Sequence, residues 1–271
     1  MKHRKKLIPA IIGFFSITIL LFTGCTNKED KKAKYLEAGV VYFQGQEFKK
    51  AEIEFKNAIQ IDPNYTDAYL KLGDTMIKLG DAQGAFQAYS KVEQLSPGNI
   101  EALTILAKFY LLNKRVGDAK NRINKILEID KDNIDGLLLN AQILVNEKDY
   151  DNAERLFKRI LTKEEYNIPT LQGLARIEYF KQNYDQAEAL LLKALSSDTQ
   201  NMASRVALVR FYLGRKDYVK AEGQLKQIAQ ENPNQAVHLI TLGNFYTSLK
   251  KMDQAENAYK KALEVEPNSL R

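Results

Sequence analysis

Residues that carry catalytic or redox chemistry are scarce in this sequence of 271 residues. It contains no tryptophan, one cysteine and two histidines. A single cysteine excludes an internal disulfide framework and a zinc site made of several cysteines. His3 lies in the N-terminal segment, so His238 is the only histidine of the remaining chain. A Ser-His-Asp or Cys-His arrangement therefore lacks its parts, and we expect His238 to be a surface or interface residue.

The motifs that bind phosphate or calcium are missing as well. No two glycines lie five residues apart, which excludes a P-loop. Residues 130–136 resemble the start of a calcium loop. However, Ile134 holds a ligand position, Gly136 comes one place late, and Ala141 stands where a bidentate Glu is required. We therefore expect no catalytic residue, no metal and no cofactor, and the sequence predicts that the protein is not an enzyme.

The excess of positive charge is confined to the N-terminus. The chain has 40 lysines and arginines and 34 aspartates and glutamates. Four of the basic residues and none of the acidic ones precede residue 25, so the rest of the chain has 36 basic and 34 acidic residues. This near balance lacks the basic footprint of a nucleic-acid-binding protein. Nucleic acid is therefore not an expected partner.

Residues 1–24 have the features of a secretory signal peptide. Lys2, Arg4, Lys5 and Lys6 precede an apolar run over residues 7–22, and small residues follow. As a helix this run would reach about 24 Å, which is short of the ~30 Å hydrocarbon core of a bilayer. A cleaved signal is the prediction. An uncleaved anchor and a signal without lipidation are the alternatives.

The segment LFTGC at residues 21–25 resembles a bacterial lipobox, with Phe22 in place of the usual Leu. The resemblance implies that Cys25 becomes the acylated first residue, and that residues 25–31 form the lipidated Cys and a short charged tether. It also implies an exported protein that its lipid anchors to the bacterial membrane. Thr26 follows the cysteine where an Asp would signal retention in the inner membrane. The expected location is therefore the periplasmic side of the outer membrane in a cell with two membranes.

The rest of the chain repeats every 34 residues without an insertion. Counting Lys32 as position 1 gives seven units that end at Ser269. The units are 32–65, 66–99, 100–133, 134–167, 168–201, 202–235 and 236–269. Position 20 is alanine in every unit, at Ala51, Ala85, Ala119, Ala153, Ala187, Ala221 and Ala255. A strict period of this length indicates a repeat architecture in which each unit is one supersecondary element.

Three further columns follow the same period. Position 8 is small in six units, at Gly39, Gly73, Ala107, Ala141, Ala175 and Gly243, and is Val209 in the other. Position 24 is large and apolar, at Phe55, Tyr89, Ile123, Phe157, Leu191, Leu225 and Tyr259. Position 32 is proline in four units, at Pro63, Pro97, Pro233 and Pro267. Small residues at positions 8 and 20 indicate that two helices cross closely, because a larger side chain would push them apart.

Each unit is predicted to be a pair of helices. In the first unit Tyr35, Ala38, Gly39 and Tyr42 recur at the spacing of one helix face. A break near positions 14–16 contains Gly, Asn or Asp, at Gly45, Gly80, Asp81, Asn113, Asp149, Asn183 and Asp217. Asp and Asn at this place can cap the second helix by accepting its free amide protons. Proline at position 32 ends that helix because it lacks the backbone donor.

This pattern resembles the tetratricopeptide repeat across all seven units. The resemblance implies an all-α fold, a right-handed α-solenoid of seven 34-residue helix-turn-helix repeats with a concave groove. Units four to six depart most from the family pattern, at Asn140, Glu178, Arg205 and Val209. Each repeat is expected to contact mainly its neighbours, so that stability builds along one dimension.

In this family, ligands lie along the first helices at positions 2, 5, 9, 12 and 13. Positions 5 and 12 are mostly apolar in this chain, and position 9 between them is basic in the middle units. The candidate groove residues are Lys108, Leu138, Gln142, Arg176, Tyr179, Phe180 and Arg210. A cationic strip with an aromatic anchor suits an acidic, partly apolar protein or peptide segment. The alternative is that the apolar side chains pack within the solenoid, and that Tyr179 replaces a core residue displaced by Glu178.

The expected function is a membrane-anchored protein-interaction scaffold in a bacterial envelope assembly or export machine. Residues 35–39 (YLEAG) and 55–63 (FKNAIQIDP) after the lipobox resemble the start of repeat lipoproteins associated with exosortase and exopolysaccharide systems. A pilotin-like escort for a secretin or type IV pilus is the first alternative. Direct binding of an anionic polysaccharide is the second, although the absence of tryptophan counts against it.

The last repeat is followed by two residues, Leu270 and Arg271. Solenoids end in a capping element with a polar outer face. We therefore expect Tyr259, Ala262 and Leu263 to be partly uncovered. Either the natural chain continues beyond Arg271, or a partner or a second copy of the chain covers this end of the solenoid.

Overall fold

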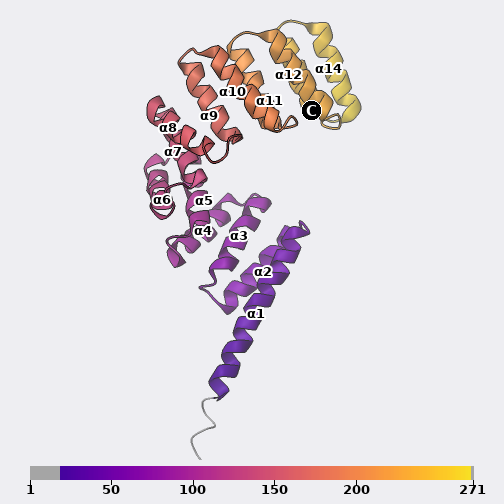
Figure 1. Cartoon of the computed structure of the whole chain (residues 1–271). Coiled ribbons are helices and arrows are strands. Elements are labelled where there is room, and N and C mark those ends of the chain that lie inside the picture. Colours follow the sequence, from indigo (N-terminus) through magenta and orange to yellow (C-terminus); the bar gives the residue numbers. More distant parts are fainter. Residues whose placement is uncertain (1–18, 270–271) are drawn as a thin grey trace, which may run out of the picture. The chain divides into compact units, whose positions relative to one another are not determined.

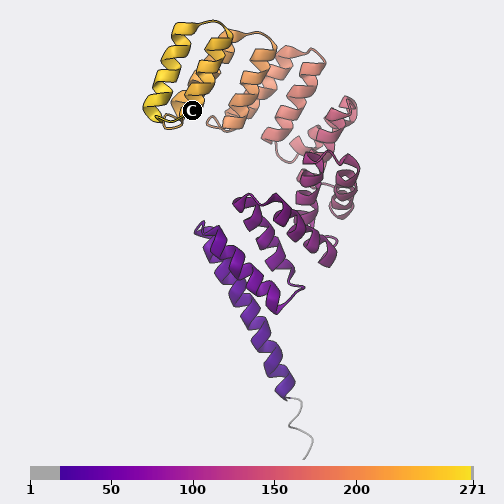
Figure 2. The same cartoon turned by 180° about the vertical axis from the view of Figure 1, so that it is seen from behind.

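The computed structural model describes residues 19–269, with side chains from residue 27 onward. This part of the chain contains fourteen α-helices and no β-strand (Figure 1, Figure 2). It divides into two compact units, with the boundary between Lys131 and Asp132. Within each unit successive helices pack as antiparallel pairs, one pair for each 34-residue repeat, and the all-α repeat prediction is confirmed.

The first unit holds repeats one to three. Its helices are α1 (Ile19–Gln44), α2 (Phe48–Ile61), α3 (Thr66–Leu79), α4 (Ala82–Leu95), α5 (Ile100–Leu112) and α6 (Val116–Ile129). The second unit holds repeats four to seven. Its helices are α7 (Ile134–Asn146), α8 (Tyr150–Leu161), α9 (Ile168–Phe180), α10 (Tyr184–Ser197), α11 (Met202–Gly214), α12 (Tyr218–Glu231), α13 (Ala236–Ser248) and α14 (Met252–Val265).

Helix α1 begins earlier than the sequence suggested. Residues 26–31 were expected to form a tether before the first helix, but they are helical and continuous with it. The backbone of α1 also passes without a break through the expected cleavage point. Residues 1–18 and the side chain of Cys25 lie outside the described part, so the signal and the lipidation site stay predictions. No helix in the described range is long and apolar enough to cross a membrane.

The small residues at position 8 make room for a ring at position 24 of the same repeat. A methyl group added at Gly39, Gly73 or Gly243 would overlap the ring of Phe55, Tyr89 or Tyr259, respectively. In the fourth repeat position 8 is an alanine, and Phe157 instead places its ring against Gly173 of the next repeat. Glycine and aromatic ring thus form one packing unit, because the ring occupies the volume that a Cβ would need.

The turn inside each pair has the same backbone geometry in all seven repeats. The residue at position 15 has a positive φ at Gln46, Gly80, Lys114, Lys148, Gln182, Lys216 and Lys250. The amide of the next residue then donates to the carbonyl at position 11, as from Asp81 to Met76 and from Asp149 to Leu144, both at 2.9 Å. These two features define a Schellman motif, which ends the first helix and starts the second.

Helix capping follows the prediction in part. The carboxylates of Asp81, Asp149 and Asp217 accept from backbone amides in the first turn of α4, α8 and α12. Asn183 was expected to cap α10 but makes no such bond, because its amide donates instead to the buried carboxylate of Glu178 at 2.8 Å.

A second set of caps, at the first helices, was not predicted. Asparagines at position 34 cap the first helices of four successive repeats, at Asn99, Asn133, Asn167 and Asn201.

Arg205 departs from the family pattern and is almost completely buried. Its Nε and Nη2 donate to the two carboxylate oxygens of Glu231 at 2.8 and 2.6 Å, and Nη2 also donates to the carbonyl of Thr199 at 2.6 Å. A buried guanidinium is tolerated here because its charge is paired and its donors are used. The departure is therefore compensated by Glu231 of the same repeat and by the Thr199 carbonyl of the preceding one.

The last helix is more covered than expected. Ala262 of α14 is fully buried and Tyr259 is half-buried, with its hydroxyl donating to Asn244 Oδ1 at 2.8 Å. The expectation that all three residues are uncovered is thus wrong for Ala262, which packs toward α13. Leu263 is 39% exposed, as is Val265.

Candidate functional site

A cavity of about 320 Å³ opens between α9, α10 and α11 of the second unit. Positions 5, 9 and 12 of a first helix share one face because successive residues turn by roughly 100°. This periodicity brings Gln172, Arg176 and Tyr179 of α9 to the cavity. Its other walls are Ala175 of α9, Leu191 of α10 and three residues of α11, namely Ala207, Arg210 and Phe211.

Tyr179 forms the aromatic wall of this cavity and is also part of the packing behind it. The centroid of its ring lies 6.0 Å from the ring centroid of Phe211 and 5.4 Å from that of Tyr184. Both pairs have edge-to-face geometry. Its hydroxyl points at Gly214, where an added Cβ would come within 2.6 Å of it. The two interpretations of Tyr179 are therefore not exclusive, because one half-buried side chain serves the groove and the core.

Arg176 and Arg210 supply the charge at the cavity. Both side chains are exposed, and neither forms a hydrogen bond or an ion pair with any residue in the described part of the chain. The guanidinium of Arg176 lies 5.6 Å over the ring of Phe180, which is 49% exposed. By contrast, Arg122 and Arg205 are paired with Glu93 and Glu231.

Gln172 adds a donor to the wall of the cavity. Its Nε2 is buried and has no hydrogen-bond partner among the described residues. Buried polar atoms are nearly always satisfied, so this donor in the cavity wall is available to a ligand group that accepts. None of the residues that line the cavity in this structure carries a carboxylate. The cavity thus combines two cations, one amide donor and an aromatic wall, which suits a carboxylate-bearing, partly apolar ligand.

The other predicted groove residues lie apart from this cavity. Leu138 and Gln142 belong to α7, where Leu138 is half-buried and Gln142 is exposed, and neither lines the cavity. Lys108 belongs to the first unit. It lines a separate cavity of about 330 Å³ with Ile77 and Phe109, among other apolar residues. The structure therefore brings Arg176, Tyr179 and Arg210 together, with Phe180 beside them.

Ala207 and Phe211 were not predicted from the sequence. They occupy positions 6 and 10 of α11, while only positions 2, 5, 9, 12 and 13 were considered. In two adjacent first helices the facing sides differ: α9 contributes positions 5, 8, 9 and 12, whereas α11 contributes positions 6, 9 and 10. A helical-wheel comparison of adjacent repeats would have found them. Within the described residues there is no group of three or more His, Cys, Asp or Glu side chains that could hold a metal ion.

Curated proteins match the chain over short stretches. The BBSome complex member BBS4 of Bos taurus is 34% identical over 73 residues, which are 27% of this chain and 14% of that protein. The peroxisomal targeting signal receptor of Komagataella phaffii is 34% identical over 67 residues, which are 25% of this chain and 12% of the receptor. The matched stretches are thus a small part of the length of these relatives.

Solved structures match most of the fold. A tetratricopeptide repeat protein of Parabacteroides merdae has a TM-score of 0.69 at 19% identity and covers 89% of this chain and 95% of its own. PilF of Pseudomonas aeruginosa has a TM-score of 0.60 at 18% identity, over 76% of this chain and 94% of its own. PilW, a type IV pilus biogenesis factor, has a TM-score of 0.63 at 16% identity, over 74% and 94%.

Family models agree with the period found in the sequence. A model described as tetratricopeptide repeat matches residues 76–143, 144–210 and 182–239. A second model of that description matches residues 236–269, and a model described as TPR repeat matches residues 39–80. These matches cover most of the repeated region, and the chain belongs to the tetratricopeptide repeat family.

Proposed function

We propose that this protein is a lipid-anchored scaffold of the bacterial envelope that binds an acidic, partly apolar protein segment in the groove between α9 and α11. Tetratricopeptide repeats are typically non-catalytic, and their stacked helices provide extended binding surfaces for proteins. The observation that carries the proposal is the pair of unpaired guanidiniums, Arg176 and Arg210, beside the half-buried ring of Tyr179.

The chemistry of the groove selects the ligand. A guanidinium binds a carboxylate through two parallel hydrogen bonds, so each arginine can hold one Asp or Glu side chain. The ring of Tyr179 and the methyl group of Ala207 leave an apolar surface between them. A ligand with one apolar side chain between two acidic ones would use both arginines and the apolar surface. Arginine and tyrosine are also the residue types that most often dominate interface energies.

The test compares one groove variant with a matched control. The probe is a fluorescein-labelled peptide with alternating Glu and Leu, titrated by fluorescence polarisation. Arg176→Ala and Arg210→Ala should each weaken binding at least tenfold, equivalent to about 1.4 kcal/mol. Arg155→Ala removes an exposed arginine of the same unit outside the groove and should leave the affinity unchanged. Equal losses for all three variants would show non-specific charge attraction and would overturn the proposal.

Tyr179→Ala is a weaker probe of the groove than either arginine. Its ring packs on Phe211 and Tyr184, so removing it should lower the melting temperature as well as the affinity. A stability loss with unchanged peptide capture by the folded fraction would assign Tyr179 to the core alone. In that case the arginine variants still decide whether the groove binds the peptide.

The envelope location rests on the lipobox resemblance at residues 21–25. Cys25 would carry the acyl chains, and two or more chains give stable membrane attachment because each buried methylene adds about 0.8 kcal/mol. Cys25→Ser should leave the precursor unprocessed or release the protein from the membrane. Mass spectrometry of the mature protein tests this, and an unmodified Cys25 would refute the anchor. The repeat-lipoprotein resemblance of residues 35–39 and 55–63 favours an export or exopolysaccharide machine.

A pilotin-like escort is the second candidate function. The observation in its favour is the similarity of fold to PilW, a type IV pilus biogenesis factor, over 94% of that chain. An escort would be required for a secretin to reach the outer membrane. Loss of the secretin multimer from that membrane in a deletion strain would favour this function over a scaffold.

The polysaccharide alternative is tested by competition. If polygalacturonate competes with the Glu-Leu peptide at equal carboxylate concentration, this alternative is favoured.

The proposal includes a contact at the C-terminal end of the second unit. Leu263 and Val265 of α14 are each 39% exposed and offer an apolar edge to a partner or a second copy. Light scattering of the full chain tests self-association, and Leu263→Lys should abolish any dimer that uses this edge.

A further inference from the structure

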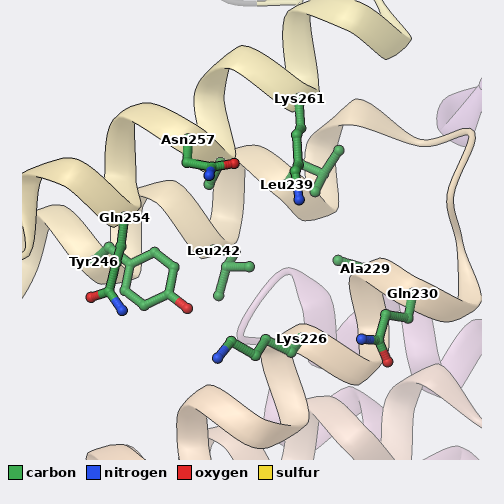
Figure 3. Close-up of a pocket in the computed structure, with 10 residues that line it drawn as sticks. Lys226, Ala229, Gln230, Leu239, Leu242, Tyr246, Gln254, Asn257 and Lys261 are labelled. Carbon is green, nitrogen blue, oxygen red and sulfur yellow. The ribbon is translucent and has the colours of Figure 1, made fainter.

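The second unit has another cavity, of about 340 Å³, between α12, α13 and α14 (Figure 3). Its apolar lining comes from Leu239 and Leu242 of α13, Ala229 of α12 and Ala258 of α14. The rim bears polar side chains from α12 and α14, which the close-up shows around the opening: Lys226, Gln230, Gln254, Asn257 and Lys261.

This cavity lies on the opposite side of the first helices from the groove between α9 and α11. Leu239, Leu242 and Tyr246 occupy positions 4, 7 and 11 of their repeat, whereas Gln172, Arg176 and Tyr179 line the groove from positions 5, 9 and 12 of theirs. At roughly 100° per residue these two sets point in directions roughly 130° apart on the helix. The cavity therefore belongs to the face of the unit where the second helices lie.

Two small residues open the cavity. Ala229 stands at position 28, where five of the other repeats have Ile59, Leu127, Leu161, Leu195 and Leu263. Ala258 stands at position 23, where the four preceding repeats have Arg122, Leu156, Leu190 and Gln224. The two positions face the same space from adjacent second helices. In this repeat pair neither side chain fills it, so a hollow remains.

The rim has donors and acceptors for a peptide but no acid. None of the described residues that line the cavity has a carboxylate. Lys226 is already paired with Glu222 at 2.7 Å, whereas Lys261 forms no ion pair within the described range. The side-chain amides of Gln230, Gln254 and Asn257 likewise form no hydrogen bond within the described range. Each amide can both donate and accept, which matches the alternating groups of an extended backbone.

We propose that this cavity is a second protein-binding site, which takes one large apolar side chain of a partner with a carboxylate beside it. Leu239, Leu242, Ala229 and Ala258 would surround the apolar side chain, and Lys261 would pair with the carboxylate. The rim amides would bond to the backbone of the same segment. An aliphatic acid such as octanoate offers the carboxylate and the apolar chain but no backbone, so the amides favour a peptide. With the groove on the other face, the unit could hold two partners at once.

The experiment uses photo-cross-linking of the full chain. The probe is the peptide acetyl-Ala-Asp-azidophenylalanine-Asp-Ala-amide, and mass spectrometry locates the adduct. We expect adducts on α12–α14 in the wild type. Ala229→Leu restores the residue type of the other repeats and should fill the cavity, reducing these adducts at least fivefold without lowering the melting temperature. Lys261→Gln, a surface change, should reduce them at least threefold.

Controls separate this site from the groove. Arg176→Ala should reduce any adducts on α9–α11 and leave those on α12–α14 unchanged, so that the two proposals fail independently. The probe with Asn in place of both Asp residues should label α12–α14 at least threefold less. Adducts on α12–α14 that persist in both Ala229→Leu and Lys261→Gln would overturn the inference. Octanoate and the unlabelled peptide are also compared as competitors. If octanoate suppresses these adducts more effectively than the peptide, the cavity is a lipid site and the inference is overturned.

Discussion

The turn residue at position 15 shows how one backbone conformation accepts several side chains. It is left-handed in every repeat, but only Gly80 has the residue type that adopts this conformation freely. Lys114, Lys148, Lys216 and Lys250 hold it because the Schellman hydrogen bonds on both sides fix the chain. Each of these lysines therefore keeps local strain that the repeat packing overcomes.

Replacing such a lysine by glycine should stabilise the protein. Lys114→Gly relieves the steric cost of the left-handed conformation, and we expect a gain of about 0.5–1 kcal/mol in unfolding free energy. Gly80→Ala should cost about 1 kcal/mol for the same reason. Lys56→Gly in the middle of α2 is the matched control and should cost about 1 kcal/mol. Urea unfolding measures all three, and a destabilised Lys114→Gly would contradict the argument.

The helix pair is held together by its closest crossing. Position 20 is alanine throughout, and the structure buries all seven alanines, several with no exposed surface. At this place the second helix has no room for a longer side chain. Where position 8 is an alanine, as at Ala141, its Cβ already occupies space that a glycine would leave to the ring at position 24. The ring of Phe157 lies instead over Gly173 of the next repeat.

Overpacking one crossing should be costly. Ala153 of α8 has no exposed surface, and we expect Ala153→Leu to lower the unfolding free energy by about 1–3 kcal/mol. Asp151→Ala, an exposed position in the first turn of the same helix, should cost less than 1 kcal/mol. Thermal melts compare the two. A melting temperature for Ala153→Leu equal to that of the wild type would refute the packing register.

Neighbouring repeats in the second unit are linked by a recurring polar contact. The glutamates at position 21 of three successive repeats, Glu154, Glu188 and Glu222, pair with a lysine of the following repeat: Lys181, Lys220 and Lys251, respectively. Tyr212 and Tyr246 donate to Glu188 and Glu222 as well. Repeat interfaces add up in a solenoid, so these contacts stabilise the whole unit.

This arrangement predicts acid sensitivity. Hydrogen bonds from Lys226 first, then from Tyr246 and Lys251, lower the pKa of Glu222 from 4.5 to about 2, and Lys220 and Lys158 lower the pKa of Glu188 and Glu154. A carboxylate with a lowered pKa stabilises the folded state above its unfolded pKa and loses that contribution as protons bind. Stability should therefore fall between about pH 4.5 and pH 2.

Melting curves at pH 7, 4 and 3 measure this loss. Glu222→Gln should be less stable than the wild type at pH 7, by about 1–2 kcal/mol, because it removes a carboxylate that accepts from charged donors. At pH 3 the difference should shrink. Lys260→Gln, on an exposed pair with Glu256 at the surface of α14, is the control and should change little. An unchanged gap between Glu222→Gln and the wild type at pH 3 would contradict the assignment.

The repeat architecture could be predicted from residue order because it depends on local regularities. The 34-residue period, the small residues at positions 8 and 20 and the Asp caps of α4, α8 and α12 act within one repeat or between neighbours. Their physical effect is the same wherever the pattern recurs. The placement of Arg176, Tyr179 and Arg210 at one groove followed from the same periodicity, since equivalent positions of adjacent first helices face the same way.

The cavities themselves depend on pairs of residues from different repeats. Phe211 lines the groove because the side of α11 that faces α9 carries other repeat positions than the side of α9 that faces α11. Ala229 and Ala258 open a hollow only because both are small and α12 and α14 bring them to one space. Tyr179 serves the groove and the core because Gly214 leaves room for its hydroxyl. Volume left between helices is a property of three-dimensional packing, so no single column of the repeat reveals it.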